Sequence, residues 1–293
     1  RRRLAGRSEA RQARSRPAKS HQRREVLERL REAGGENDRA VVAFSGGVDS
    51  GLLAYVATET LGADRVLCAT AVSPSLAAAE RAACRDLAAD WGLRWQEVRT
   101  EEMTRAAYRT NDGDRCFWCK DALMDALTPL ADEVDATVLL GVNVDDLGDH
   151  RPGQEAARRR GARFPLVDAG LRKDEIRAAA RDLGLAVWDK PAAPCLASRV
   201  PYGTEVSVGV LGQVERAEAG LRALGLGDLR VRHYDDLARL EVPVAALEVV
   251  LARRPEVVAA VRAAGYRYVT LDLEGLRSGN LNAALDLGGE ALA

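Results

Sequence analysis

A glycine-rich turn between an expected strand and an expected helix is the most constraining feature of this sequence. The turn reads Ser-Gly-Gly-Val-Asp-Ser and covers residues 45–50. The apolar run before it, Ala40–Phe44, is typical of a buried parallel strand, and the apolar periodicity of Leu52–Leu61 is typical of a helix. Glycines let a backbone turn sharply and approach an anion without an intervening side chain. Because the free N–H groups and the dipole of a helix N-terminus favour negative charge, this order predicts a phosphate-binding loop.

The loop differs from the two commoner nucleotide-binding fingerprints. It has no Gly-Lys-Ser/Thr, which excludes a Walker P-loop, and no Gly-x-Gly-x-x-Gly of a dinucleotide-binding fold. Ser45 and Ser50 add hydroxyl donors, and Asp49 can cap the helix or hold a cation such as Mg²⁺ between phosphates. The motif resembles the PP-loop of the ATP pyrophosphatase family. That resemblance implies cleavage of ATP between its α and β phosphates, with AMP passed to an acceptor oxygen; a chance glycine-serine turn is the simpler alternative.

The chain up to about residue 190 alternates strand-like and helix-like segments. The expected strands are Val41–Phe44, Val66–Ala71, Leu93–Val98, Thr137–Gly141 and Ala186–Trp188, and the expected helices include Leu76–Trp91, Lys120–Leu130 and Lys173–Leu183. This alternation predicts an α/β fold: a Rossmann-like parallel sheet of the PP-loop type, with helices on both faces and ligands at the carboxyl edge of the strands. With 293 residues, 47% of them hydrophobic, the chain can build this core and a second, smaller one.

A different order follows residue 203. Residues 205–225 are expected to form a helix, Leu229–Tyr234 and Leu237–Val242 two strands, residues 244–252 and 255–264 short helices, and Tyr266–Leu273 a last strand. This order predicts a smaller α+β domain for substrate binding or oligomerisation. We therefore expect three parts: a basic tail at 1–23, an ATP pyrophosphatase domain at 24–203 and the C-terminal domain at 204–293.

The N-terminal segment is strongly basic, although the whole chain has a net charge of −1. Residues 1–24 hold ten Arg or Lys against one Glu and lack apolar periodicity, so we expect a disordered tail. A nucleic-acid-binding arm is the alternative, which the absence of aromatic residues between the arginines disfavours. No secretory signal or membrane-spanning run is evident, and the cysteine number is odd at five. These observations predict a protein of the reducing cytoplasm.

Polar residues follow the fourth expected strand and so belong near the phosphate loop. Asn143, Asp145 and Asp146 come directly after it; the two aspartates suit Mg²⁺ ligation and turn or cap roles equally well. Lys173 opposes the dipole of the helix that it begins, so it is either a phosphate-neutralising residue or an ordinary exposed lysine. The residues expected to bind ATP or pyrophosphate are Phe44, Ser45, Gly46, Gly47, Val48, Asp49, Ser50, Ser73, Asn143 and Lys173.

Three of the five cysteines lie in patterns that suggest chemistry. Cys116 and Cys119 form a C-x2-C pair, and Cys195 stands in Pro-Cys-Leu-Ala-Ser-Arg. Cys68 and Cys84 fall within an expected strand and helix and are most simply packed thiols. A lone C-x2-C can be a redox pair or half of a zinc site completed by a third cysteine and a histidine. Three thiolates can also hold a [4Fe–4S] cluster and leave one iron open for an extra sulfide.

Six segments together resemble the LarE family of ATP-dependent sulfur transferases. They are SGGVDS, RCFWCK, GVNVDDLGDHRPG, KPAAPCLASRVPYG, RVRHYDD with RLEV, and GYRYVTLDLEGLRSGNLN, and they span roughly residues 24–282. The resemblance implies an enzyme that uses ATP to adenylate a carboxylate of pyridinium-3,5-biscarboxylic acid mononucleotide and then converts it to a thiocarboxylate. The product would be handed to other proteins that build the nickel-pincer cofactor of lactate racemase and related enzymes.

The resemblance also implies two sources of sulfur. In one version of the family, the cysteine that corresponds to Cys195 gives up its own sulfur and becomes dehydroalanine. In the other version, a C-x2-C pair is added and an iron–sulfur cluster supplies an extra sulfide. Because this sequence has Cys116, Cys119 and Cys195, we expect all three to be catalytic and to hold a [4Fe–4S] cluster, with sacrifice of Cys195 as the alternative. Either way, adenylation gives an inert carboxylate a good leaving group, and anionic sulfur is a good nucleophile near neutral pH.

A mononucleotide substrate needs a phosphate-binding site. Arg230 and Arg232 lie two residues apart on an expected strand, hence on one face, where two guanidiniums can grip one phosphate. Ser198 and Arg199 add a donor and a charge, and Glu241 can orient the arginines or bind ribose hydroxyls. A solvated strand face with Arg–Glu pairs is the simpler alternative, and the family resemblance favours substrate binding.

Three other functions stay open at this point. A tRNA thiolation enzyme of the same loop family would find support in the basic tail, although the rest of the chain is slightly acidic. An amidating ligase related to NAD or GMP synthetase would need no thiol, and a nucleotide-sensing scaffold would hold structural zinc. We expect a small-molecule substrate, no membrane association and assembly into a homo-oligomer.

Overall fold

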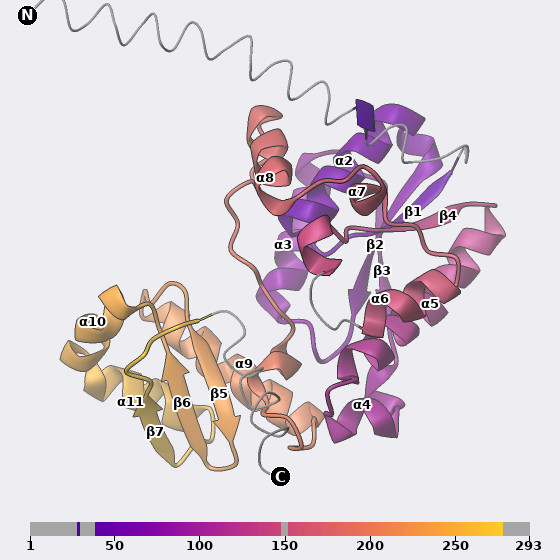
Figure 1. Ribbon diagram of the computed structural model, residues 1–293. Coiled ribbons are helices and arrows are strands. Elements are labelled where there is room, and N and C mark those ends of the chain that lie inside the picture. Colours follow the sequence, from indigo (N-terminus) through magenta and orange to yellow (C-terminus); the bar gives the residue numbers. More distant parts are fainter. Residues whose placement is uncertain (1–27, 30–38, 148–151, 278–293) are drawn as a thin grey trace, which may run out of the picture. The chain divides into compact units, whose positions relative to one another are not determined.

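The computed structural model describes residues 28–29, 39–147 and 152–277 (Figure 1). The basic tail expected at residues 1–23 lies outside the described residues. Two compact units are present: the first comprises the described residues up to Ala71 with Ala78–Thr100 and Leu123–Ala193, and the second comprises Val72–Ala77, Glu101–Ala122 and the described residues from Pro194 onward. The second unit thus includes Val72–Ala77, Glu101–Ala122 and the residues from Pro194 up to residue 203, and the domain boundary at residue 203 stays a prediction.

The first unit contains a four-stranded sheet. Its strands are β1 (Ala40–Ala43), β2 (Val66–Val72), β3 (Trp95–Arg99) and β4 (Thr137–Leu140), in the order β3-β2-β1-β4. β1 pairs in parallel with both β2 and β4, so that Val41 lies opposite Leu67 and Val138. A parallel sheet in the centre of an α/β unit confirms the predicted fold class.

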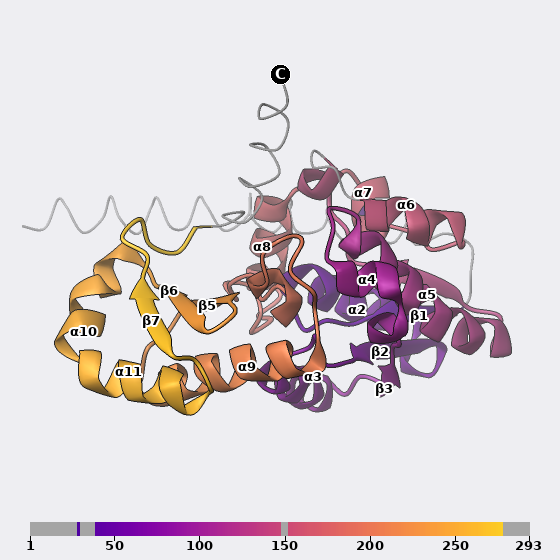
Figure 2. The same cartoon turned by 90° about the horizontal axis from the view of Figure 1, so that it is seen from below.

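Both faces of this sheet are buried against helices (Figure 2). The helices of the first unit include α2 (Val48–Leu61), α3 (Ala78–Asp90), the C-terminal part of α5 (Arg115–Glu133), α6 (Pro152–Arg159), α7 (Pro165–Asp168) and α8 (Lys173–Asp182). Because successive strand side chains point to opposite faces, Val42 packs with Leu53 of α2 and Ala88 of α3, whereas Val41 packs with Leu127 of α5. A further apolar cluster joins α2 to α8.

The second unit contains a three-stranded sheet in the order β5-β6-β7. β5 (Arg230–Tyr234) and β6 (Leu237–Glu241) form an antiparallel hairpin, and β7 (Tyr268–Leu271) adds in parallel to β6. The core of this sheet includes Leu221 of α9 (Val208–Ala223), Val250 of α10 (Leu247–Ala252) and Val261 of α11 (Arg254–Ala263). The order of elements is the one predicted for residues 205–273. The short helix α4 (Ala106–Thr110) and the 3₁₀ turn η4 (Leu196–Arg199) also belong to this unit.

Two of the sequence predictions need correction. Ala186–Trp188 forms no strand but a turn after α8, because Val187 is buried against α2 and α8 and needs no strand partner. The helix predicted from Lys120 begins five residues earlier, at Arg115. The C-x2-C pair therefore lies in the first two turns of α5, with its cysteines three residues apart on one side of the helix.

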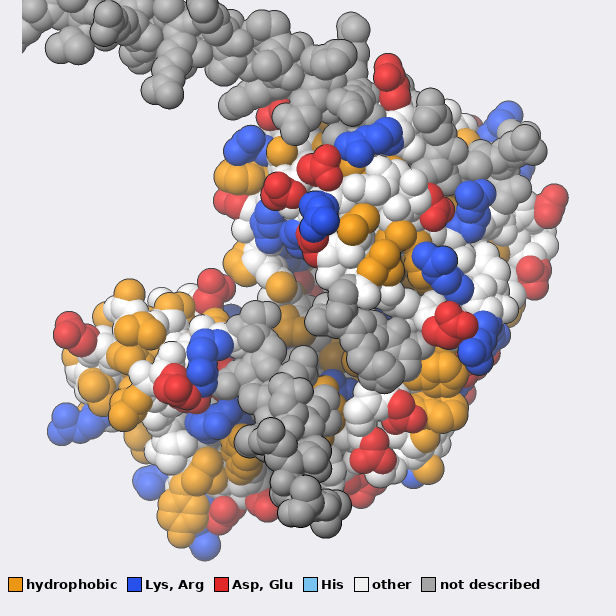
Figure 3. All heavy atoms as spheres, in the orientation of Figure 1, with side chains coloured by type: hydrophobic (Ala, Val, Ile, Leu, Met, Phe, Trp, Pro, Cys, Tyr) orange, Lys and Arg blue, Asp and Glu red, His pale blue; other side chains and the backbone are white. Residues whose placement is uncertain are grey.

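The described surface carries mixed charges and several exposed apolar side chains. On the face drawn in Figure 3, acidic and basic side chains of the first unit are interspersed rather than segregated. Exposed apolar side chains of the second unit include Val249 and Leu251 of α10 and Tyr268 of β7. Among the described helices, none combines the length and the apolar character that crossing a membrane requires.

The backbone at Gly141, which follows β4, packs closely against the first turn of α2. A Cβ added at Gly141 would lie 2.8 Å from the backbone nitrogen of Ser50, in the first turn of α2. Since backbone cannot move away as a flexible side chain can, we expect Gly141→Ala to cost about 1–3 kcal/mol of stability. Gly227→Ala, where nothing lies within 4 Å, is the matched control. Thermal unfolding measures both; equal midpoints for the two variants would contradict this packing.

Candidate functional site

The phosphate loop leaves the carboxyl end of β1 and meets α2 at its N-cap, Gly47. Gly46 has φ +66°, a left-handed conformation that glycine adopts without strain. Ser50 Oγ accepts a hydrogen bond from the Ser45 N–H at 3.2 Å, lies 3.0 Å from Ser45 Oγ and donates to the Gly47 carbonyl at 3.3 Å. The two serines thus close the loop on itself. Among the described residues, no side chain caps α2, so the N–H groups at its start are available to an anion.

Three of the residues expected at the phosphate site, Asp49, Asn143 and Lys173, are in contact with one another through Asp49. Its carboxylate forms an ion pair with Lys173 Nζ and accepts a hydrogen bond from Asn143 Nδ2 at 3.4 Å. Asn143 is buried, and Lys173 is the first residue of α8. Residues predicted from three separate segments therefore lie together at the carboxyl edge of the sheet. Because Lys173 already neutralises Asp49, a Mg²⁺ ion held there would share or replace that contact.

The two aspartates that follow β4 have structural partners. Asp145 accepts hydrogen bonds from the Lys173 N–H at 2.8 Å and from Arg172 Nη1 at 3.0 Å, at the N-terminus of α8. Asp146 accepts one from the Asn143 N–H at 3.2 Å. A carboxylate at a helix N-terminus is stabilised by the free N–H groups and the helix dipole. Of the two roles left open by the sequence, this geometry favours turn and cap residues.

The side chains of three other residues expected at the ATP site, Phe44, Val48 and Ser73, are engaged in contacts within their own units. The side chains of Phe44 and Val48 are buried in the cores on either side of the loop, so only their backbone is available to a ligand. Ser73 belongs to the second unit, where its Oγ accepts a hydrogen bond from the Ser75 N–H at 3.2 Å.

The sequence analysis missed one basic residue at the loop. Lys190 Nζ donates to the Gly46 carbonyl at 3.1 Å and pairs with Glu80 of α3 at 2.8 Å. The sequence feature that could have pointed to Lys190 is its position as the first residue of Lys-Pro-Ala-Ala-Pro-Cys. The sequence analysis assigned a role in that segment only to the cysteine.

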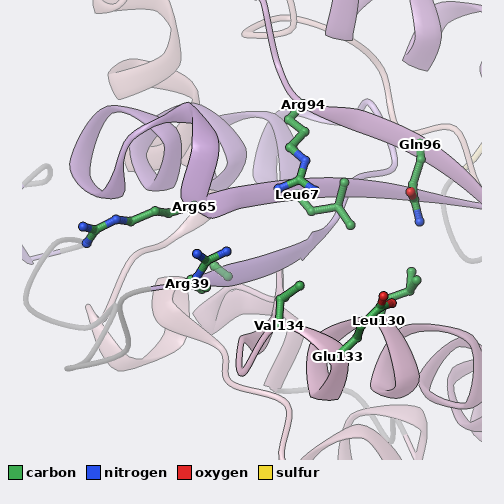
Figure 4. A pocket seen from close by; sticks show the side chains of 9 residues that line it. Arg39, Arg65, Leu67, Arg94, Gln96, Leu130, Glu133 and Val134 are labelled. Carbon is green, nitrogen blue, oxygen red and sulfur yellow. The ribbon is translucent and has the colours of Figure 1, made fainter.

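A small pocket of the first unit lies at the opposite edge of the sheet (Figure 4). Its lining includes Arg39, Arg65 and Arg94, which directly precede β1, β2 and β3 and so mark the amino edge. Ligands of open α/β sheets bind at the carboxyl edge, where the phosphate loop lies. The pocket volume of about 130 Å³ is also below the ~300 Å³ of a typical small-molecule site. This pocket is therefore not the candidate site.

The three candidate cysteines all belong to the second unit. Cys116 and Cys195 are exposed, and Cys119 is half-buried. Burial, followed by the charge of Cys195, raises the pKa of Cys119 to about 12, so this thiol is protonated at neutral pH unless a metal ion binds it. Within the described ranges, no three His, Cys, Asp or Glu side chains are arranged to hold a metal ion. The thiols interact electrostatically but, with the other side chains that the structure describes, form no ligand set for zinc or for a cluster.

The remaining two cysteines are buried, as expected of packed thiols. Cys68 lies in β2 and Cys84 in α3, and neither is accessible to solvent. Burial raises the pKa of Cys68 to about 12 and is also the main reason why the pKa of Cys84 is raised. Both thiols are therefore neutral core side chains.

A buried arginine lies beside the candidate cysteines. Arg115 is 6% exposed, and its Nη1 donates to Asn111 Oδ1 at 2.5 Å and to the Ala197 carbonyl at 2.9 Å. Asn111, also buried, donates in turn to carbonyls of residues 200–204. These bonds fasten the segment after Cys195 to the start of α5. No carboxylate pairs with Arg115 in the described part of the chain, so its positive charge favours anionic sulfur nearby.

Arg199 holds the backbone around Cys195. Its Nε and Nη2 bind Glu218 at 2.8 and 3.1 Å, and its Nη1 donates to the carbonyls of Pro194 at 2.6 Å and Cys195 at 3.2 Å. The same Nη1 lies 3.0 Å from Ser198 Oγ. Because Arg199 is buried and its donors are engaged, the geometry favours a positioning role over the direct substrate contact expected from the sequence.

Glu218 is the centre of this network. It is 1% exposed and also accepts hydrogen bonds from Arg222 at 2.8 Å and from the Val231 N–H at 3.1 Å. Burial alone would raise the pKa of Glu218, but the hydrogen bond and charge of Arg199, with these two further donors, outweigh it. The pKa of Glu218 is therefore lowered, and the carboxylate is ionised at neutral pH.

Arg230 and Arg232, the residues of the predicted phosphate clamp, lie on the strand β5. Arg232 donates to the Ser198 carbonyl and pairs with the buried Glu241, both at 2.7 Å, but its buried Nε has no partner among the described residues. Glu241 also pairs with Arg239 at 2.9 Å. Burial, and next the charge of the nearby Arg199, lower the pKa of Arg230. A region with more guanidiniums than carboxylates and an unused buried donor suits an anionic group such as a phosphate.

Comparisons with known proteins place the chain in a family. No protein-family model matches it. An uncharacterised protein of Synechocystis sp. is 46% identical over 262 residues, which cover 88% of this chain and 97% of that protein. The pyridinium-3,5-bisthiocarboxylic acid mononucleotide synthase of Lactiplantibacillus plantarum is 37% identical over 248 residues, which cover 84% of this chain and 90% of the synthase. The chain belongs to the LarE family.

The LarE resemblance drawn from the six sequence segments is thereby confirmed. An uncharacterised protein of Methanocaldococcus jannaschii is a further relative, 27% identical over 244 residues that cover 83% of this chain and 92% of that protein. The alignments extend over most of each relative's length.

The Glu218 network gives a prediction with a defined pH dependence. Glu218→Ala leaves the buried Arg199 without its counter-ion, so we expect a loss of about 3–5 kcal/mol, whereas Glu248→Ala on the exposed face of α10 is the neutral control. Because the native pKa of Glu218 is lowered, its contribution is complete above the ordinary carboxyl pKa of about 4.3 and is lost as the pH falls through the native value. Denaturant unfolding of wild type and Glu218→Gln from pH 7 to 3 should show converging stabilities; a constant difference would contradict this account.

Proposed function

We propose that this LarE-family chain is an ATP-dependent sulfur transferase that converts a carboxylate of pyridinium-3,5-biscarboxylic acid mononucleotide to a thiocarboxylate. The observation that carries the proposal is the 37% identity to a bisthiocarboxylate mononucleotide synthase over 84% of a chain that has its own phosphate loop. The enzyme would act in the cytoplasm, supply the proteins that build a nickel-pincer cofactor, and assemble as a homo-oligomer. Light scattering tests the last point.

The first unit would activate the acid. The loop at residues 45–50 offers the uncapped N-terminus of α2 and the hydroxyl of Ser45 to the β and γ phosphates of ATP. Lys173 and Asn143 lie beside it at Asp49, the residue that would hold Mg²⁺. When bound, Mg²⁺ would neutralise phosphate charge. The carboxylate of the substrate would attack the α phosphorus, release pyrophosphate and form an acyl adenylate.

The second unit would bind the substrate phosphate and supply the sulfur. Arg230 and Arg232 provide the excess positive charge and the unused donor described above. Anionic sulfur near Cys195 would attack the acyl carbon and expel AMP, since AMP is a far better leaving group than oxide. If that sulfur is the Cys195 thiolate, the product is a thioester; loss of the Cα proton and cleavage of the Cβ–S bond would then release the thiocarboxylate and leave dehydroalanine. Arg199 fixes the carbonyl of Cys195, and Arg115 favours negative charge on sulfur.

For the source of sulfur we propose a [4Fe–4S] cluster on Cys116, Cys119 and Cys195, with sacrifice of Cys195 as the alternative route. The donors are chemically suitable, since all three are free thiols and two are exposed. As the side chains lie, however, they form no metal-binding group, so cluster binding would require them to move together. We therefore derive no step through the cluster and separate the two routes by experiment.

The experiment is anaerobic incubation of the purified chain with ATP, Mg²⁺ and the biscarboxylate mononucleotide. We expect pyrophosphate, AMP and thiocarboxylate in equal amounts. Thiocarboxylate with unaltered protein, iron and acid-labile sulfide supports the cluster route, whereas a loss of the elements of hydrogen sulfide at Cys195 supports sacrifice. No pyrophosphate release in the presence of the acid would refute the proposal.

Serine substitutions separate the same routes and the rival functions. Cys195→Ser should abolish thiocarboxylate formation by either route, because it removes the third cluster ligand in one route and the sulfur donor in the other. Cys116→Ser and Cys119→Ser should abolish turnover only if a cluster supplies the sulfur; under sacrifice they should leave one turnover from Cys195.

The same three variants test a rival function, since an amidating ligase would keep full turnover in all of them. A tRNA thiolation enzyme would instead bind tRNA after deletion of residues 1–24.

The substrate clamp makes a separate prediction. Arg230→Ala should raise the KM for the biscarboxylate mononucleotide about 10- to 100-fold, because a charge-assisted hydrogen bond contributes roughly 1.5–3 kcal/mol. The KM for ATP should not change. Arg267→Ala, at an exposed arginine of the same unit, is the control. Steady-state kinetics with varied acid and varied ATP distinguish the two constants, and an unchanged KM for the acid would exclude Arg230 from the clamp.

A further inference from the structure

Lys190 contacts the phosphate loop at the carbonyl of Gly46. Its Nζ lies 3.1 Å from that oxygen and 2.8 Å from Glu80 Oε2 on α3. Only 22% of the Lys190 side chain and 28% of the Glu80 side chain is exposed, so water and salt screen this ion pair less than a surface pair. A Cβ built on Gly46 would lie 3.7 Å from the Nζ. The ammonium therefore packs directly against the turn of the loop.

The backbone of Lys190 is held in place as well. Arg177 of α8 donates to the carbonyls of Trp188 at 2.7 Å and Lys190 at 2.9 Å. The Lys190 N–H donates to the carbonyl of Val187 at 3.2 Å, and Val187 is buried in the cluster between α2 and α8. Because the base of the side chain is fixed, Lys190 loses less conformational entropy on reaching Gly46 than an unsupported lysine would lose.

The consequence for the loop follows from the shape of a peptide group. The peptide between Gly46 and Gly47 is trans and planar, so its C=O and its N–H point in opposite directions. With the carbonyl directed to Lys190, the Gly47 N–H is directed away from Lys190. This N–H has no hydrogen-bond partner in the described part of the chain. It is an oriented donor at the N-cap of α2, where anion binding is favoured.

We propose that Lys190 is a positioning residue of the phosphate loop, which orients the Gly46–Gly47 peptide so that the Gly47 N–H donates to a pyrophosphate oxygen. The inference rests on the proposed function, because it takes ATP as the ligand of this loop. Glu80 holds the ammonium in place and neutralises it. Lys173 is likewise paired with a carboxylate, that of Asp49, but Lys190 also donates to a backbone carbonyl of the loop.

Three substitutions test the role. Lys190→Met removes the donors and keeps a similar stem, Lys190→Arg restores donors, and Glu80→Gln removes the counter-ion but keeps the lysine. Arg85→Met, at an exposed residue on the same helix as Glu80, is the control. Calorimetry on the full chain measures the affinity for inorganic pyrophosphate and for ATP, kinetics give the KM for the acid, and thermal unfolding gives the midpoint.

Lys190→Met should weaken the binding of both phosphate ligands about 10-fold or more, the scale of one charge-assisted hydrogen bond. The KM for the acid and the unfolding midpoint should stay near wild type, a split that a merely structural role would not produce. Lys190→Arg should recover most of the affinity, and Glu80→Gln should lose less than Lys190→Met.

The outcomes separate this inference from the proposed function. If the wild type binds pyrophosphate and ATP, and Lys190→Met binds them equally well, the inference is wrong and the proposed function stands. If Lys190→Met and Glu80→Gln lose affinity equally, the ion pair matters rather than the contact with Gly46, and the inference is overturned. If the wild type binds neither ligand, the proposed function fails, and this inference with it.

Discussion

The close approach of two backbones at the carboxyl edge of the parallel sheet determines the geometry of the phosphate loop. Gly141, at the end of β4, leaves no room for a Cβ against the first turn of α2. This contact places the start of α2 beside the residues that follow β4, and so brings Asn143 to Asp49. The loop itself closes through Ser45 and Ser50. A glycine is required where the two backbones meet, because any side chain would separate them.

Each of the two lysines at the loop forms an ion pair with a carboxylate, so that the charges of each pair cancel. Lys173 with Asp49 and Lys190 with Glu80 each place a cation against the loop together with its counter-ion. Such pairs add little net stability, because the cost of desolvation offsets most of the attraction. Their effect is on geometry, since each holds a side chain or a carbonyl in one orientation. A loop held in this way needs little rearrangement when a polyphosphate binds.

The second unit uses arginines in the same manner. Arg115, Arg199 and Arg232 donate to backbone carbonyls at residues 194–198, around Cys195. The buried carboxylates Glu218 and Glu241 pair with Arg199 and Arg232, respectively. One network therefore positions the cysteine segment and leaves an excess of positive charge on β5. This links the sulfur-bearing residues to the proposed phosphate clamp within a single unit.

The sequence by itself determined the fold class and most elements, because strand–turn–helix patterns reflect burial that repeats along the chain. It also identified Asp49, Asn143 and Lys173, whose side chains the structure brings together. It failed at Ala186–Trp188, where burial between helices replaces strand pairing, and at Lys190, whose contact with Gly46 joins residues 144 positions apart. The contacts that favour a positioning role for Arg199 and a cap role for Asp145 are likewise visible only in the tertiary structure. The type of a residue determines which hydrogen bonds and ion pairs its side chain can make. Only the folded chain determines which of the possible partners lies within bonding distance.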